Sequence, residues 1–321
     1  MFFGMKIFSL LHAWLLVVYS AAAPIEPEEL LAYTDIHTRY GQVSLRRHLG
    51  SGAYGAVYAG RWGGKSAAVK IAFTADYSAC IDYKRAPKQY GSIAYEYGVM
   101  NRMQTENGFP KMYFSDLLSQ GRKLYVMQLL GKSLGQIADE RERINDRPLT
   151  AVAMQMLDRI EAVHKRGYVI FDVLPDNFLV HKGKVHLIDL GMALSFRDKT
   201  GLHVAASTSL IYGECKTSSF SSVNDLVGNS VSRKDDLERF VYVLMYLGGW
   251  ELLWKRGART TSERVDNKIR QFGNYMEWFS APKMKWLGEI FAVVQKLQFS
   301  QDPDYASIRR IIRAYRNGLS F

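Results

Sequence analysis

The chain is poor in cysteine, with only Cys80 and Cys215 among its 321 residues. Small secreted domains are usually dense in disulfides, so the sequence does not describe a disulfide scaffold. It also lacks an N-x-Ser/Thr glycosylation sequon, metal-finger spacing, an internal repeat and a basic stripe interleaved with aromatic residues. These absences argue against zinc-finger, repeat and sequence-specific nucleic-acid-binding proteins. With 48% hydrophobic and 23% charged residues, the chain has the composition of an ordinary globular protein.

Acidic residues are outnumbered, 31 to 42, which leaves a formal net charge of +11. This balance favours acidic or phosphate-bearing partners, although charge alone does not choose among them. The length suits one large or two medium domains with a sizeable core.

Residues 1–22 resemble a secretory signal peptide. Lys6 forms a short basic region, Ile7–Tyr19 is apolar, and small residues follow. The alternative is an uncleaved anchor, but the apolar run is short for a membrane span and contains His12. We expect residues 23–41 to be an acidic, proline-containing leader, and we expect no stable membrane span after cleavage.

A glycine-rich stretch, L-G-S-G-A-Y-G-A-V, carries Gly50, Gly52 and Gly55. The spacing G-x-G-x-x-G also occurs in dinucleotide-binding folds, where a helix begins at the third glycine. Here the chain stays strand-like, turns at Arg61–Lys65 and continues as a second strand over Ala67–Phe73. This predicts a flap whose backbone N–H groups approach nucleotide phosphates closely.

The second strand carries A-A-V-K, which places Lys70 where an ammonium group could hold the α- and β-phosphates. The carboxylate partner that we expect is Glu96, in an apolar pattern with helical spacing. Taken singly, Lys70 could be a solvated strand lysine and Glu96 an exposed helix glutamate. Their order before the motif described next favours a functional pair.

The segment Y-V-I-F-D-V-L-P-D-N-F-L-V, followed by H-L-I-D-L-G, contains Asp172, Asn177 and Asp189. Two short apolar strands joined by a turn at His181–Gly183 would bring the three side chains together. Asp189 and Asn177 offer hard oxygen ligands suited to Mg²⁺, and Asp172 could orient a hydroxyl and accept its proton. The spacing D-x-x-x-x-N, then D-x-G, is that of a protein-kinase catalytic loop and metal-binding turn. The alternative is three turn residues.

Elsewhere, Tyr113–Leu118 and Lys123–Leu130 are predicted strands, and residues 128–130 form a hinge that could bind an adenine edge. Thr150–Lys165 is a predicted amphipathic helix. Residues 194–231 lack periodicity and are expected to be an activation segment or a loop. Ser232–Asp235 is a capping box before a buried apolar helix, Leu237–Leu247, which is too short to span a membrane. The remainder is expected to be helical.

These pieces together resemble a eukaryotic protein kinase, most closely the casein kinase I family. The family-like stretches are L-L-G-K-S-L, P-D-N-F-L, S-V-N in place of Ala-Pro-Glu, S-R-K-D-D-L-E and P-D-Y. The resemblance implies an α+β bilobal fold, with a β-rich N-lobe over residues 42–130 and a mainly helical C-lobe over residues 131–321.

The same resemblance implies roles for individual residues. Asp172 would be the catalytic base, Lys70 and Glu96 the catalytic ion pair, and Met127 the gatekeeper. Asn177 and Asp189 would bind Mg²⁺. ATP would be bound by Gly50, Ser51, Gly52, Gly55, Val57, Ala68, Lys70, Gln128 and Leu130.

The sequence departs from the family at four places. The family's His-Arg-Asp is Ile-Phe-Asp, with Phe171 in place of the arginine that clamps a phosphorylated activation loop. Asp-Leu-Gly replaces Asp-Phe-Gly. Leu174 replaces a lysine that contacts the transferred phosphoryl group, a loss that can cost roughly a hundredfold or more in rate. Ser219 replaces an arginine that binds phosphate or acidic groups on substrates.

The sequence therefore predicts a secreted Ser/Thr kinase that uses Mg²⁺ and ATP, acts as a monomer and phosphorylates an acidic or phosphorylated protein. Few cysteines and absent sequons suit export to the reducing, ATP-containing interior of another cell, although a domain of this size can fold without either. Two other hypotheses stay open. One is an ATP-binding pseudokinase scaffold, which Leu174 favours, and the other is an interaction protein that binds no nucleotide.

Overall fold

The computed structural model describes residues 34–52, 55–73, 92–118, 121–206 and 219–319. The strands are β1 Asp35–Thr38, β2 Gly41–Gly52, β3 Gly55–Trp62, β4 Lys65–Ala72, β5 Met112–Leu117, β6 Lys123–Gln128, β7 Tyr168–Val169, β8 Phe178–His181, β9 Lys184–Leu187 and β10 Leu194–Ser195. The α-helices are α1 Ile93–Arg102, α2 Leu134–Arg141, α3 Asp146–Lys165, α4 Val223–Leu226, α5 Arg233–Leu247, α6 Thr261–Gln271, α7 Lys285–Gln295 and α8 Tyr305–Gly318. Short 3₁₀ helices lie at Pro175–Asn177, Leu253–Lys255, Phe272–Phe279 and Pro282–Met284.

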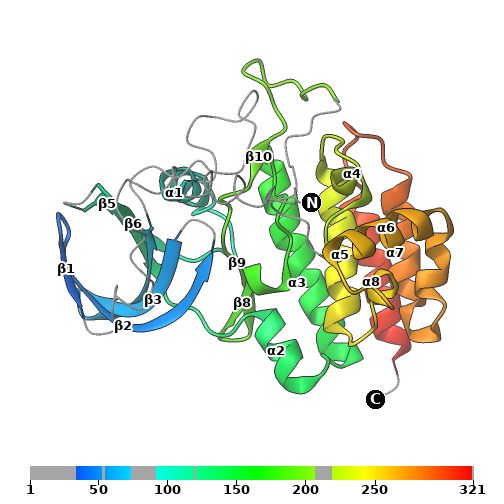
Figure 1. Ribbon diagram of the computed structural model, residues 1–321, viewed down its shortest axis with the longest axis horizontal. Helices are drawn as coiled ribbons and strands as arrows, with labels where there is room; N and C mark the ends of the chain where they lie inside the picture. Colours follow the sequence, from blue (N-terminus) through cyan, green and yellow to red (C-terminus); the bar gives the residue numbers. More distant parts are fainter. Residues whose placement is uncertain (1–33, 53–54, 74–91, 119–120, 207–218, 320–321) are drawn as a thin grey trace, which may run out of the picture.

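Strands β1 to β6 form one antiparallel sheet in the order β1-β2-β3-β4-β6-β5, and α1 packs against β4, β5 and β6. The predicted turn between β3 and β4 is tighter than expected and consists of Gly63 and Gly64 alone. Both have positive φ, +53° and +77°, a conformation that glycine adopts without steric cost. The sheet and α1 make up the N-lobe (Figure 1).

The end of the segment expected to be a leader belongs to this sheet, which corrects the expected start of the fold. Strand β1 pairs with β2, with Ile36 opposite Val43, and Ile36 packs against the apolar cluster between the strands. The alternation in D-I-H-T, with Ile36 and Thr38 the less exposed residues, explains the strand. Acidic and proline content alone did not reveal this short alternation.

The remaining helices form the C-lobe around α3 and α5. The predicted apolar face of α3, which includes Met156, Leu157 and Ile160, is fully buried, and the helix begins four residues earlier than expected. Helix α5 is buried along nearly its whole length, and the predicted capping box between Ser232 and Asp235 is present. The segment predicted to be irregular contains only the short elements β10 and α4 among its described residues.

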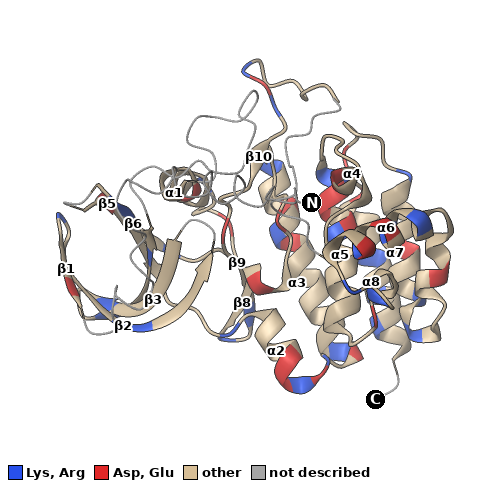
Figure 2. Cartoon of the chain, viewed as in Figure 1, with Lys and Arg blue, Asp and Glu red and all other residues tan. Residues whose placement is uncertain are grey.

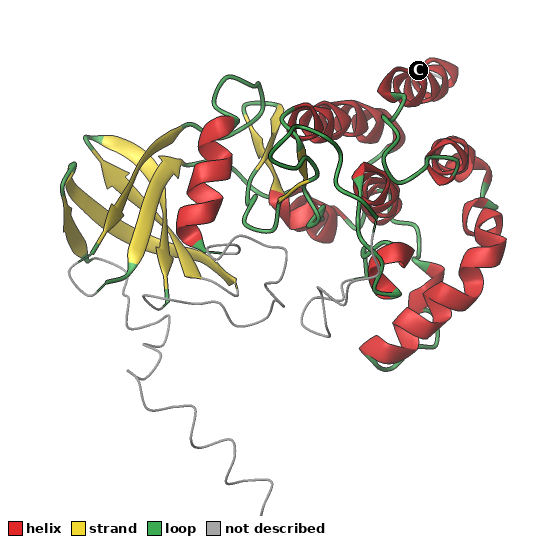
Figure 3. Ribbon diagram, turned by 90° about the horizontal axis from the view of Figure 1, so that it is seen from above, coloured by secondary structure: helices red, strands yellow, loops and turns green. Residues whose placement is uncertain are grey.

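The N-terminal lobe is built on the sheet and the C-terminal lobe is mainly helical, so the α+β bilobal prediction is confirmed (Figure 3). The change from sheet to helix falls between Gln128 and Leu134, an interval that contains the expected division at residues 130/131. In the described part of the chain, every helix is too short or too polar to cross a membrane. The predicted signal peptide, Cys80 and Cys215 lie outside the described residues.

Candidate active site

Lys70 lies at the centre of the site, between two carboxylates that come from distant parts of the chain. Its Nζ is 2.7 Å from Glu96 Oε2 and 3.3 Å from Asp189 Oδ2. Strand β4 supplies Lys70, helix α1 supplies Glu96, and Asp189 follows β9. The predicted pairing of Lys70 with Glu96 is therefore present, within contact of the predicted metal-binding aspartate.

The electrostatics of this cluster keep Lys70 charged. Burial works against its charge, but the carboxylates of Asp189 and Glu96 outweigh burial and hold the pKa of Lys70 above its ordinary value. Burial and the charge of Asp189 raise the pKa of Glu96, whereas Lys70 and the Tyr125 hydroxyl oppose that shift. Glu96 and Asp189 carry two negative charges against the single positive charge of Lys70, so the site favours a further cation electrostatically.

The loop of Asp172 and the turn of Asp189 are linked through Asn177, at the start of the β8–β9 hairpin. Asn177 Nδ2 donates to the Asp172 carbonyl oxygen at 2.9 Å, and the Asn177 carbonyl accepts from the Ile188 N–H at 2.9 Å. One residue thus ties the loop carrying Asp172 to the turn carrying Asp189. Asp189 has φ +57°, a left-handed conformation that Asp tolerates better than most residues.

The chemistry of these donors fits a magnesium ion. The side-chain nitrogen of Asn177 is engaged with Asp172, so its amide oxygen remains the atom that can face a cation. Together with the partly exposed carboxylate of Asp189, this gives two hard oxygen ligands. Magnesium commonly binds through one or two such groups plus substrate phosphates. Among the described residues, no cluster of three or more His, Cys, Asp or Glu could hold a metal by itself.

Asp236, near the start of α5, binds the backbone of the loop that leads into Asp172. This contact was not predicted from the sequence. Asp236 Oδ2 accepts the Ile170 N–H at 2.6 Å and its Oδ1 accepts the Phe171 N–H at 2.9 Å. His164 Nε2 lies 2.8 Å from Asp236 Oδ2. Phe171 has φ +67°, a strained conformation for this residue, and the two hydrogen bonds hold it immediately before Asp172. The position of Asp172 therefore depends on α5.

The three glycines of the flap differ in what requires them. A Cβ on Gly55 would lie 2.2 Å from the Ile71 carbonyl oxygen, so the pairing of β3 with β4 already demands glycine there. A Cβ on Gly50 or Gly52 would meet no atom of the described residues within 4 Å. Packing against the described residues does not require these two glycines, which is consistent with close approach of a ligand. Ser51, between them, is exposed, and its Oγ lies 2.8 Å from His48 Nε2.

The predicted adenine-binding residues come from adjacent strands. Ala68 on β4 is opposite Met127 on β6, the predicted gatekeeper, and both are buried. Val57 lies on the neighbouring strand and is partly exposed, as are Gln128 and Leu130 at the point where β6 leaves the sheet. The Gln128 N–H donates to the Lys111 carbonyl at 2.8 Å.

Phe171 and Ser219, two of the positions that depart from the family, each contact a buried cationic side chain of the protein. Arg239 Cζ lies 4.4 Å from the centre of the Phe171 ring, and Arg239 Nη2 is 2.7 Å from Asp225 Oδ2. The Ser219 carbonyl accepts from Lys268 Nζ at 3.3 Å. The segment from Ser219 to Asp225 is thus held to α5 and α6 by side chains of the protein itself.

A curled sheet over a helical lobe, with a lysine and two carboxylates meeting between them, is the arrangement of a bilobal kinase fold. A family model described as "Protein kinase domain" matches residues 43–236, more than half of the chain. The chain therefore belongs to the protein kinase domain family.

Proposed function

We propose that the protein is a Ser/Thr protein kinase that transfers the γ-phosphoryl group of ATP, bound with Mg²⁺, to hydroxyl groups of proteins. The observation that carries this proposal is the convergence on Lys70 of Glu96 and Asp189, from three separate elements, at 2.7 Å and 3.3 Å. A solvated strand lysine would not be buried between two carboxylates.

The residues divide the work as follows. Asp172 orients the acceptor hydroxyl and takes its proton as the new O–P bond forms and the bond to the leaving ADP breaks. Lys70, held by Glu96, places positive charge against the phosphates. The backbone N–H groups around Gly50 and Gly52 cover them. Magnesium held by Asn177 and Asp189 would supply further positive charge at the phosphates.

The finer assignments rest on the resemblance to casein kinase I and on composition. We propose a secreted monomer that acts on an acidic or phosphorylated protein, without specific nucleic-acid binding, in the extracellular space or inside another cell. The formal charge of +11 supports an acidic substrate. Ser219 weakens the case for substrates that carry a phosphate already. In Figure 2, Lys and Arg are interspersed with Asp and Glu over the C-lobe.

A phosphotransfer assay on the purified mature protein tests this function. The assay uses γ-labelled ATP, Mg²⁺ and dephosphorylated casein, and it compares the wild type with Asp172→Asn. Substrate labelling by the wild type alone, on Ser or Thr, is the expected result. Equal labelling by both proteins would show that the phosphate comes from a contaminating kinase.

Leu174 supports a second candidate, an ATP-binding pseudokinase that acts as a scaffold. A leucine two residues after Asp172 leaves the transferring phosphoryl group without the lysine that usually contacts it. Nucleotide binding without turnover in the wild type would favour this candidate.

A further inference from the structure

Tyr125 lies against the catalytic ion pair, and nothing described above assigns it a role in the reaction. It is on β6, two residues before Met127, and directly opposite Lys70 on β4. Because side chains opposite one another on paired strands point to the same face, Tyr125 and Lys70 both reach toward α1. The Tyr125 hydroxyl donates to Glu96 Oε1 at 2.6 Å, and the side chain is only 2% exposed.

Glu96 is therefore held at both carboxylate oxygens by donors from neighbouring strands. Lys70 binds Oε2, and Tyr125 binds Oε1. Glu96 is 1% exposed, so its carboxylate needs protein donors in place of water. A carboxylate held at one oxygen can still rotate about its last side-chain bond. A second donor on the other oxygen removes that freedom.

This second contact matters because Lys70 is shared. Its Nζ lies 2.7 Å from Glu96 and 3.3 Å from Asp189, so the two carboxylates compete for the same ammonium group. Fixing Glu96 in one orientation defines where the ammonium group of Lys70 rests. A lysine that keeps this position when nucleotide enters is already oriented toward the phosphates.

We propose that Tyr125 is a positioning residue of the phosphotransfer site, whose hydroxyl holds Glu96 in the orientation that directs Lys70 to the nucleotide phosphates. The inference rests on the proposed kinase function and adds to it a residue that acts through Glu96. Burial raises the pKa of the Tyr125 hydroxyl well above its ordinary value, so this group remains a donor at neutral pH.

The alternative is that Tyr125 only fills space. Its ring lies 6.1 Å from the ring of Tyr97 and belongs to the core beneath α1. Tyr125→Phe separates the two roles, because it keeps the ring and removes the hydroxyl alone. A packing role predicts almost no effect, whereas a positioning role predicts a loss at the nucleotide site.

A double-mutant cycle tests the proposal on the full-length mature protein. The four proteins are the wild type, Tyr125→Phe, Glu96→Gln and the double variant. Each is measured for kcat and ATP KM with casein, for the Kd of a fluorescent ATP analogue with Mg²⁺, and for melting temperature. The Kd does not depend on turnover, so a slow enzyme can still be tested.

We expect Tyr125→Phe to lower kcat/KM for ATP by about ten- to a hundredfold, as for loss of a hydrogen bond to a charged group. The double variant should be no worse than Glu96→Gln alone, because the hydroxyl acts only through Glu96. The fluorescent analogue should bind Tyr125→Phe more weakly than the wild type.

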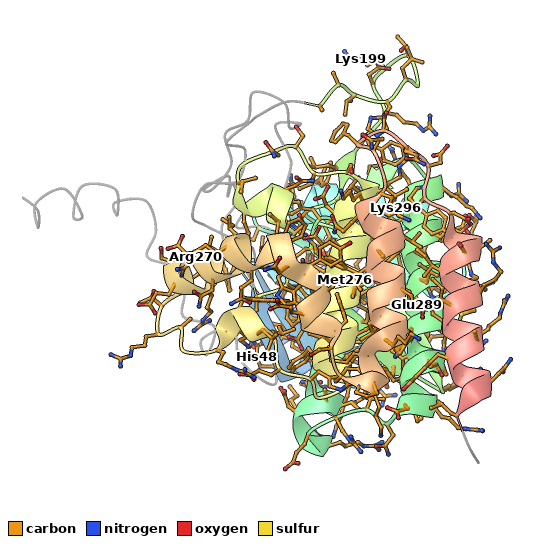
Figure 4. The ribbon with its side chains drawn as sticks, turned by 90° about the vertical axis from the view of Figure 1, so that its right-hand side faces the viewer. His48, Lys199, Arg270, Met276, Glu289 and Lys296 are labelled. Atoms are coloured by element: carbon orange, nitrogen blue, oxygen red, sulfur yellow. The ribbon has the colours of Figure 1, made fainter. Side chains whose placement is uncertain are left out.

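Tyr242→Phe is a matched control. Tyr242 is a buried tyrosine of the C-lobe whose hydroxyl donates to Glu238 Oε1 at 2.8 Å, so the same kind of hydrogen bond is lost away from the nucleotide. It should lower the melting temperature while leaving ATP KM and the analogue Kd unchanged. For Glu96→Gln the control is Glu289→Gln, an exposed position on the outer side of α7 (Figure 4).

Two results would overturn the inference while the kinase function stands. One is a Tyr125→Phe protein with wild-type kcat/KM and Kd. The other is independent, additive losses for Tyr125→Phe and Glu96→Gln. Failure of the proposed function looks different, because the wild type itself would then show no phosphotransfer, while the Kd of Tyr125→Phe against that of the wild type would still test the inference. If the wild type bound no analogue either, the inference would fall with the proposed function.

Discussion

Leu174 is the residue at which the active and inactive interpretations of this kinase divide. It follows Asp172 by two positions and precedes the 3₁₀ turn that carries Asn177. The other charged groups proposed to act on the phosphates are present, and Lys70 is in contact with Asp189. We therefore expect slow catalysis rather than none.

Leu174→Lys should raise kcat by about ten- to a thousandfold and change ATP affinity little. A lysine there would contact the phosphoryl group mainly in the transition state, and such contacts act on kcat. Steady-state kinetics measure the effect, with Leu117→Lys as a control that adds the same charge at an exposed site on β5. An unchanged kcat would mean that another basic group already fills the role.

Asp189→Asn should remove the dependence of ATP binding on Mg²⁺. A ligand that binds only the folded state raises the melting temperature, and the amide replaces the only carboxylate among the two proposed metal ligands. Thermal shift with ATP, with and without Mg²⁺, measures this, and Asp266→Asn on the exposed face of α6 is the control. If Asp189→Asn kept the full Mg²⁺ effect, the ion would have to be held elsewhere.

At the scale of the element, the start of α5 supports the catalytic loop through Asp236. Replacing one of its oxygens with an amide nitrogen leaves the N–H of Ile170 or Phe171 facing another donor. Asp236→Asn should lower the free energy of unfolding by about 1–3 kcal/mol and reduce kcat as Asp172 loses its fixed position. Urea unfolding and kinetics measure the two effects. A stable variant with unchanged kcat would show that the loop holds its own shape.

The neighbouring Asp235 should make stability depend on pH. Burial and the charge of Glu238 raise its pKa to about 6. Between about pH 4 and 6 the folded state then binds more protons than the unfolded state, so the free energy of unfolding falls as pH rises, by up to about 3 kcal/mol. Asp235→Asn resembles the protonated form and should lose this fall while retaining an acceptor for the Ser232 N–H.

Urea unfolding from pH 4 to pH 7 compares the two proteins. Their stabilities should be similar near pH 4, and the variant should be the more stable protein at pH 7. Parallel curves over the whole range would contradict the assignment to Asp235.

Elements with a local signal were predictable from the sequence. The hairpin that follows Asn177 has two short apolar runs joined by a turn, and the capping box of α5 lies within four consecutive residues. The support by Asp236 was not predictable, because its partners are 65 and 66 residues away and depend on how α5 packs. The role of Tyr125 was less predictable. Strand periodicity places Tyr125 on the same face of β6 as the predicted gatekeeper Met127, but it does not reveal the contact with Glu96.

At the scale of the whole molecule, the site exists only because the two lobes meet. The N-lobe supplies Lys70 and Glu96, the C-lobe supplies Asp172 and Asn177, and Asp189 joins them through its contact with Lys70. The order of motifs along the chain predicted this assembly. The start of the fold was misplaced because β1 adds a strand before the first recognisable motif.

The central claim is that this assembly transfers phosphate, and one measurement tests it most directly. Wild-type protein and Asp172→Asn are each incubated with γ-labelled ATP, Mg²⁺ and dephosphorylated casein, and phosphorylated residues are identified by mass spectrometry. We expect both proteins to bind nucleotide, because Asp172 is not among the groups assigned to ATP, and only the wild type to phosphorylate Ser or Thr. Nucleotide binding by both, with no phosphorylation by the wild type above the level of Asp172→Asn, would contradict the claim.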